Sequence, residues 1–175
     1  MDRDKEGERI VTVLSSLIQS VRSNMIRWDI CRDWTDRSRL RETAERQYAL
    51  MMRIADAYLV WPEAFGTRVL ELEGIKRRLR RMEAWEVQIM TALLHLMQSV
   101  RSDLNRAALY AGTQRETRYI AVRRQLDDLE KMVRRHRIPP EAYGSSLREM
   151  MYLYRCADYL PSDWNAYTSA VQHWL

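Results

Sequence analysis

Two stretches of this chain carry nearly the same sequence. Residues 10–27 read IVTVLSSLIQSVRSNMIR and residues 89–106 read IMTALLHLMQSVRSDLNR, with identical residues at 10 of the 18 positions. A second match follows in the same order and at almost the same offset, because Pro62–Gly66 (PEAFG) corresponds to Pro140–Gly144 (PEAYG). Two matches at nearly one spacing predict that a module of about 80 residues occurs twice in tandem.

The apolar residues within each module predict helices. They recur at spacings of three and four residues, which places them on one stripe of a helix, and no stretch shows the period of two that a strand requires. The chain also has only 5 glycines and 4 prolines, fewer than a β-sandwich or barrel needs for its turns. The expected apolar stripes cover residues 10–25, 40–59, 69–82, 89–104, 120–133 and 147–157. We therefore predict an all-α fold, a helical bundle.

Prolines and a glycine mark the expected helix ends. Pro62 ends the second helix and suits the first turn of a third, and Ala111–Thr113 is an expected break. Pro139–Pro140 and Pro161 stop the fifth and sixth helices, and Ser162–Asp163 can cap a short terminal helix. The predicted organisation is two tandem three-helix repeats, 1–82 and 83–160, with a C-terminal helical extension, 161–175, in one compact unit.

The positive charge of the chain indicates an anionic partner. The net charge is +5 with a pI near 9.4, and 26 of the 29 basic residues are arginine. Arginine presents a planar fork of donors that grips phosphate in a bidentate manner, whereas lysine is a hydrated point charge. A GC-rich genome or a hot habitat would also raise the arginine content, and many arginines are expected to pair with the 24 acidic residues on helix surfaces.

Polar side chains on the matched helices and two basic runs are the candidate nucleic-acid contacts. Matched positions opposite the apolar stripe are Thr12, Gln19 and Ser23 in the first copy and Thr91, Gln98 and Ser102 in the second. A solvated face has no packing reason to recur, so we expect it to meet one kind of partner, although a recent duplication or burial against another helix would also preserve it. The two basic runs are Lys76–Arg81 and Arg134–Arg137. For the second run, the alternative explanation is a favourable interaction of its cations with the C-terminal end of the helix dipole. The candidate residues are Gln19, Arg22, Ser23, Arg27, Lys76, Arg77, Arg78, Arg80, Arg81, Gln98, Arg101, Ser102, Arg106, Arg123, Arg124, Arg134, Arg135 and Arg137.

The sequence lacks the clustered groups that catalysis requires. His95, His136 and His173 are far apart, and no acidic residue lies three or four positions from any of them. Phosphate-binding glycine loops and a GxSxG nucleophile motif are also missing, and Cys31 and Cys156 have no evident base partner. We therefore expect no enzyme, no catalytic residues, no cofactor, no metal and no small-molecule substrate.

Membrane insertion and secretion are not expected either. No apolar run approaches the roughly 18 residues of a membrane span, and the charged first residues lack the apolar segment of a signal peptide. Two cysteines make no disulfide framework. The expected location is intracellular or within a virion assembled there.

These features favour a non-enzymatic structural protein that coats nucleic acid through backbone contacts, many copies assembling side by side. The Arg-rich helices and the paired QSVRS segments, Gln19–Ser23 and Gln98–Ser102, make the chain similar to the all-helical coat proteins of archaeal filamentous viruses. That resemblance implies double-stranded DNA as the nucleic-acid partner and other copies, or a paralogous subunit, as neighbours in a helical nucleocapsid. It assigns no role to any single residue.

Two other functions remain open at this level. One is a protein–protein adaptor or regulatory helical bundle whose matched faces bind helices of a partner. The other is a DNA-binding regulator, which would prefer one short sequence. Coating by backbone contacts would instead weaken steeply with salt and show little sequence preference.

Overall fold

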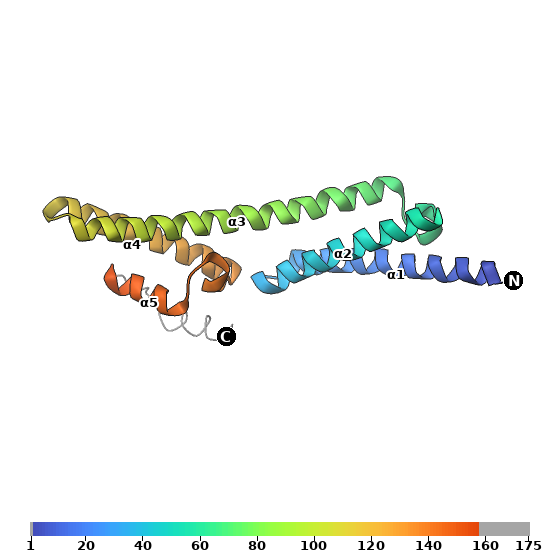
Figure 1. Ribbon diagram of the computed structural model, residues 1–175, viewed down its shortest axis with the longest axis horizontal. Helices are drawn as coiled ribbons and strands as arrows, with labels where there is room; N and C mark the ends of the chain where they lie inside the picture. The colour runs from blue at the N-terminus through green and yellow to red at the C-terminus, as the bar shows by residue number, and fades with distance from the viewer. Residues whose placement is uncertain (1, 158–175) are drawn as a thin grey trace. The chain divides into compact units, whose positions relative to one another are not determined.

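The chain forms five α-helices and two short 3-10 helices within residues 2–157, the part that the computed structural model describes, with side chains from residue 5 onward (Figure 1). The elements are α1 (Asp2–Ile30), α2 (Trp34–Tyr58), η1 (Pro62–Phe65), α3 (Val69–Leu109), α4 (Gly112–His136), η2 (Pro140–Tyr143) and α5 (Leu147–Cys156). No strand occurs in this part of the chain, so the all-α prediction is confirmed. The terminal helix expected after Ser162–Asp163 lies outside the described residues.

The third and fourth helices expected from the sequence are one helix, α3, of 41 residues. Met82 and Ile89 are seven residues apart, which is about two helical turns, so the apolar stripes that end and begin with them lie on the same face of the helix. No glycine or proline interrupts the backbone between them. Glu86 occupies the buried position between the two stripes, and this charged residue concealed their continuity. The expected start was also wrong, because Pro62 begins η1 and α3 begins only at Val69.

The contacts of the described residues divide the chain into two compact units. Unit 1 contains residues 2–31 and 35–86, and unit 2 contains residues 32–34 and 87–157. The long helix α3 contributes to both, since the division falls after Glu86. The tandem-repeat organisation with modules at 1–82 and 83–160 stays a prediction.

Each unit has a core of apolar side chains from three helices. In unit 1 it consists of Leu14, Ile18, Val21, Met25, Ala44, Met51, Ala55, Phe65, Leu72, Ile75, Leu79 and Met82. Buried side chains of unit 2 include Leu93, Met97, Val100, Val122, Leu126, Leu129, Val133, Tyr143, Met150 and Leu153. Val13 and Ile120, which the sequence placed on the core stripes, are exposed because they lie at the edges of those stripes.

The same turn follows the second helix of each unit. Leu59 after α2 and Arg137 after α4 adopt positive φ angles of 51° and 49°. The next amide then donates to the carbonyl five positions earlier, at 2.9 Å and 3.1 Å respectively, which is the hydrogen bond of a Schellman motif. A 3-10 helix follows in both units and ends at Gly66 or Gly144, whose φ angles of 80° and 70° suit glycine because it has no Cβ.

A partly buried hydrogen bond from a side-chain amide joins the first two helices of each unit. Asn24 donates to Gln47 at 3.0 Å in unit 1, and Gln125 donates to Asp103 at 3.0 Å in unit 2. Asn24 corresponds to Asp103 in the first sequence match, and Gln47 corresponds to Gln125 at the offset of the second match. Unit 2 has a carboxylate where unit 1 has an amide, and Arg118 compensates this buried charge with an ion pair to Asp103 at 2.9 Å.

Candidate nucleic-acid interface

Four exposed cations lie along one side of α3 in unit 1, and we call them the α3 strip. Its members are Lys76, Arg77, Arg80 and Arg81. Their spacing places them on neighbouring rows of the helix, and Ile75 and Leu79, buried on another face, hold that helix against the core. Within the described part of the chain, no strip residue makes an ion pair or a side-chain hydrogen bond.

The α3 strip is electrostatically unfavourable for the isolated helix. Lys76 and Arg80 are four residues apart, as are Arg77 and Arg81, and like charges at this spacing destabilise a helix by about 0.2–0.5 kcal/mol per pair. Glu73 lies one turn earlier, yet its carboxylate forms no ion pair with any strip residue in the described structure. The strip is therefore a concentration of positive charge that an external anion would relieve.

Arg78, which belongs to the same basic run, has a different role. Its guanidinium group forms an ion pair with Asp29 of α1, so it joins two helices of unit 1. The run predicted from the sequence thus divides into four exposed cations on the strip and one cation that is used inside the unit.

Arg22 and Arg101, the matched arginines, are partnered within their own units. Arg22 donates through Nε to Glu71 at 2.7 Å and through Nη2 to the carbonyl of Gly66 at 3.1 Å. Arg101 donates from the same atoms to Glu149 at 2.7 Å and to the carbonyl of Gly144 at 2.8 Å. Each arginine therefore holds the turn that follows a 3-10 helix, and we call the two contact sets the arginine clamps.

A hydroxyl group completes each arginine clamp. Thr67 donates to Glu71, and Ser145 donates to Glu149, both at 2.8 Å. The clamps give the matched arginines a reason to recur that needs no external partner. Their side chains are still 37% and 38% exposed, so neither is sealed in the interior, and their phosphate-binding role stays a prediction.

The arginine clamps should make stability depend on pH. The Thr67 hydroxyl and then Arg22 lower the pKa of Glu71, and Arg101 followed by Ser145 lowers the pKa of Glu149. A carboxyl whose folded pKa is lowered stabilises the fold above its unfolded pKa, and this stabilisation is lost as pH falls through the folded pKa. We expect the free energy of unfolding to fall on acidification below about pH 4.5, the ordinary pKa of these groups.

The measurement is urea unfolding at a series of pH values between about 6 and 3. The double variant Arg22→Gln/Arg101→Gln should show a shallower decline than the unmodified protein, because its carboxyls have lost their cationic partners. Parallel curves for the two proteins would show that the clamps do not contribute to the acid sensitivity.

The other candidate residues of the matched helices are mostly exposed. Gln19, Ser23 and Arg27 are exposed on α1, and Gln98 and Arg106 are exposed on α3, whereas Ser102 is half-buried. The structure thus leaves these side chains, apart from Ser102, open to a partner.

The basic residues of α4 are interleaved with acids and backbone contacts. Arg123 donates to the carbonyl of Ala157 at 2.7 Å, and Arg134 forms an ion pair with Glu130 at 2.7 Å. Lys131 pairs with the two aspartates that precede it, at positions 127 and 128. Arg124, Arg135 and Arg137 are exposed, with Arg137 at the helix cap. This helix therefore carries both cations that are compensated by acids and cations that no carboxylate of the described structure pairs with.

The stacking of Arg37 between two indole rings in unit 1 was not predicted. The Arg37 guanidinium carbon lies 4.0 Å from the ring centroid of Trp28 and 4.4 Å from that of Trp85. The two rings also meet edge to face, with centroids 5.4 Å apart. Most tryptophans were expected in the core, but a cation between them depends on residues from three separate helices and has no local signal.

The described residues contain no group of three or more His, Cys, Asp or Glu that could hold a metal ion. None of the helices in that part of the chain is long and apolar enough to cross a membrane. Comparisons with protein families, with curated proteins and with solved structures find no match to this chain.

Proposed function

We propose that this protein binds the phosphate backbone of nucleic acid through the α3 strip and coats it in many copies. The observation that carries the proposal is the exposure of four cations on one helix side without an ion-pair partner in the described structure. Three of the four are arginines, whose guanidinium groups match the geometry of phosphate oxygens. Contacts of this kind position a protein on a duplex and carry no sequence information.

The small size of the strip favours assembly over binding of single copies. Lys76 and Arg81 are separated by about 7.5 Å along the helix axis at the usual rise of about 1.5 Å per residue. One copy can therefore neutralise only about four phosphates. Stable association then requires neighbouring copies that bind the same nucleic acid and raise one another's effective concentration. This is the arrangement expected of a coat protein.

The test is the salt dependence of binding to double-stranded DNA. Four phosphate contacts predict a slope of log affinity against log salt near −3.6, and hence roughly a hundredfold loss between about 50 and 200 mM salt. Fluorescence anisotropy with two duplexes of unrelated sequence would measure it, and we expect similar affinities for both. Strong preference for one sequence would point to a regulator, and a slope near zero would exclude backbone binding.

An adaptor function is the second candidate, favoured by exposed apolar side chains where α2, η1 and α3 meet. They are Tyr58, Leu59, Trp61, Val69 and Leu70. The corresponding positions of unit 2 hold His136, Arg137, Pro139, Leu147 and Arg148, which are mostly polar or charged. Exposed apolar side chains gathered in one region suit a protein partner. Binding through them would persist at high salt, which separates this function from the first.

A further inference from the structure

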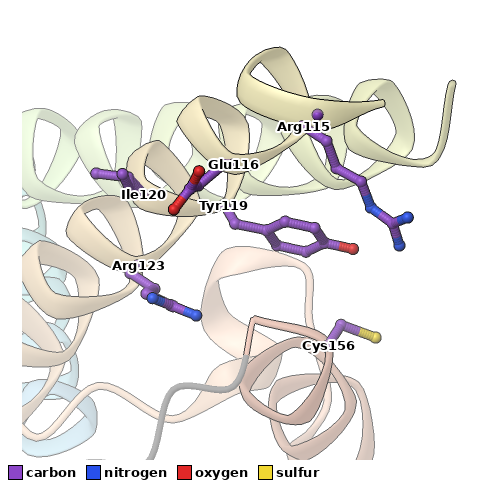
Figure 2. A pocket seen from close by; sticks show the side chains of 7 residues that line it. Arg115, Glu116, Tyr119, Ile120, Arg123 and Cys156 are labelled. Carbon is purple, nitrogen blue, oxygen red and sulfur yellow. The ribbon is translucent and has the colours of Figure 1, made fainter. Parts of the chain in front are cut away.

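Unit 2 contains a cavity of about 480 Å³ between α4 and α5 (Figure 2). Ligand pockets typically enclose about 300–1,000 Å³, so this one has room for a small organic molecule. The residues that line it are Gly112, Arg115, Glu116, Tyr119, Ile120, Arg123 and Cys156. Arg115, Tyr119 and Arg123 follow one another at intervals of four, which places all three on one face of α4.

The cavity wall offers two guanidinium groups that no carboxylate neutralises within the described part of the chain. Arg115 is exposed and lies over the ring of Tyr119, with 5.7 Å from its guanidinium carbon to the ring centroid. Arg123 uses its Nε to donate to the carbonyl of Ala157 at 2.7 Å, which leaves its terminal nitrogens for another acceptor. Glu116 shares the wall, but among the described residues it forms no ion pair with either arginine.

Unit 1 shows how the arginine that corresponds to Arg115 packs when indole rings lie beside it. Arg37 is the counterpart of Arg115 at the offset of the PEAFG and PEAYG match, and it is stacked against Trp28 and Trp85. The residue that corresponds to Trp28 in unit 2 is Ala107, so Arg115 lacks that indole ring. The guanidinium group of Arg115 is therefore more open to an external anion than that of Arg37.

We propose that the cavity between α4 and α5 binds a nucleoside phosphate. Arg115 binds the phosphate oxygens, as arginines commonly do. The base lies against the ring of Tyr119, and Arg123, on the other side of that ring, donates from its terminal nitrogens to an acceptor of the base (Figure 2). The carboxylate of Glu116 accepts a hydrogen bond from a ribose hydroxyl, a role that acidic residues take in dinucleotide sites. This inference does not depend on the α3 strip, which lies in unit 1.

Inorganic phosphate alone would use only part of this wall. One guanidinium group suffices for an anion, and the terminal nitrogens of Arg123 would then remain without an acceptor in the described structure. The negative charge of Glu116 would also oppose a simple anion, whereas it favours a ligand that carries hydroxyl donors. The mixture of cationic, apolar and acceptor groups therefore selects a phosphate attached to a nucleoside.

The test is isothermal titration of the full-length protein with AMP and, separately, with inorganic phosphate. We expect AMP to bind at least about tenfold more tightly than phosphate, because a stacked base adds favourable contacts. Arg115→Gln should weaken AMP binding about tenfold, since it removes a charge-assisted contact. The matched control is Arg148→Gln, an exposed arginine of α5 outside the cavity, which should change affinity less than about twofold.

A second arm identifies the source of the nucleotide. A single strand of about ten uridines, which keeps a ribose hydroxyl at each nucleotide, is titrated into a variant in which all four α3 strip residues are glutamine, so that the strip cannot contribute. Binding of AMP indicates a free nucleotide as ligand, and binding of the strand alone indicates an unpaired nucleotide of a nucleic acid. Binding of neither overturns the proposal. Unchanged AMP affinity in Arg115→Gln, or an equal loss of affinity in Arg148→Gln, also overturns it, whether or not the strip binds duplex DNA.

Discussion

Replacing Arg41 with methionine is expected to lower the free energy of unfolding by about 3–5 kcal/mol, the cost of leaving a buried charge without its partner. Arg41 donates through Nε to Glu86 at 2.9 Å and through Nη1 to Glu45 at 2.7 Å. The Glu86 side chain is only 8% exposed, and one of its oxygens has no hydrogen-bond partner among the described residues. Without Arg41, the carboxylate of Glu86 in the stripe of α3 would lose its direct ion-pair partner and keep only the less direct interaction with the charge of Arg37.

Two further variants separate this effect from a loss of packing. In the double variant Arg41→Met/Glu86→Leu both charges are gone, so stability should recover most of the loss and can exceed that of the original protein. Arg39→Met removes an exposed arginine from the same helix, whose nearest carboxylate, Asp36, lies 3.7 Å away, and it should cost less than about 1 kcal/mol. Urea unfolding measures all three. If the double variant were as unstable as Arg41→Met, the ion pair would not be the cause.

This buried ion pair also marks the limit of what the sequence predicts about the fold. Helix type and the buried faces follow from spacings of three and four residues, which are local, and α1, α2, α4 and α5 lie where the stripes placed them. Glu86 breaks the local pattern because its partner, Arg41, is 45 residues away. The sequence therefore divided α3 in two. Only the tertiary structure shows why a charge can occupy a core position.

The ends of the apolar stripes were predicted less well for a related reason. Tyr58 and Leu59 continue the stripe of α2 in sequence, but they are 54% and 85% exposed. Tyr58 is the last residue of α2, and Leu59 follows it in the turn with a positive φ angle, so the helical spacing ends there. Periodicity reports which face of a helix is apolar, and it does not report at which residue the helix ends.

For the candidate interface, the sequence located the cations but could not sort them. Arg78 lies inside the basic run, yet its partner Asp29 is 49 residues away. Arg22 and Glu71 are also 49 residues apart. Which arginines stay available for a phosphate depends on such distant carboxylates, so the α3 strip could be separated from the arginine clamps only in three dimensions.

Replacing all four α3 strip residues with glutamine is expected to reduce affinity for double-stranded DNA by roughly a hundredfold at low salt. Each lost phosphate contact should lower the magnitude of the salt slope by about 0.9, so the slope should approach zero. The variant Arg9→Gln/Arg53→Gln/Arg148→Gln/Arg155→Gln serves as the control. It removes four other exposed arginines and the same net charge. If the control lost as much affinity as the strip variant, binding would follow total charge and not the strip.

The stability of the strip variant separates a binding surface from a structural one. Glutamine removes two like-charge pairs spaced four residues apart, so the variant should unfold at the same or a slightly higher urea concentration. If the strip stabilised the fold, neutralising it would lower the free energy of unfolding, as Arg41→Met is expected to do. Loss of DNA affinity together with undiminished stability is therefore the specific outcome expected if these cations are retained for an external polyanion. Retained affinity in the strip variant would remove the basis for nucleic-acid coating and leave the exposed apolar corner of unit 1, and with it a protein partner, as the better-supported function.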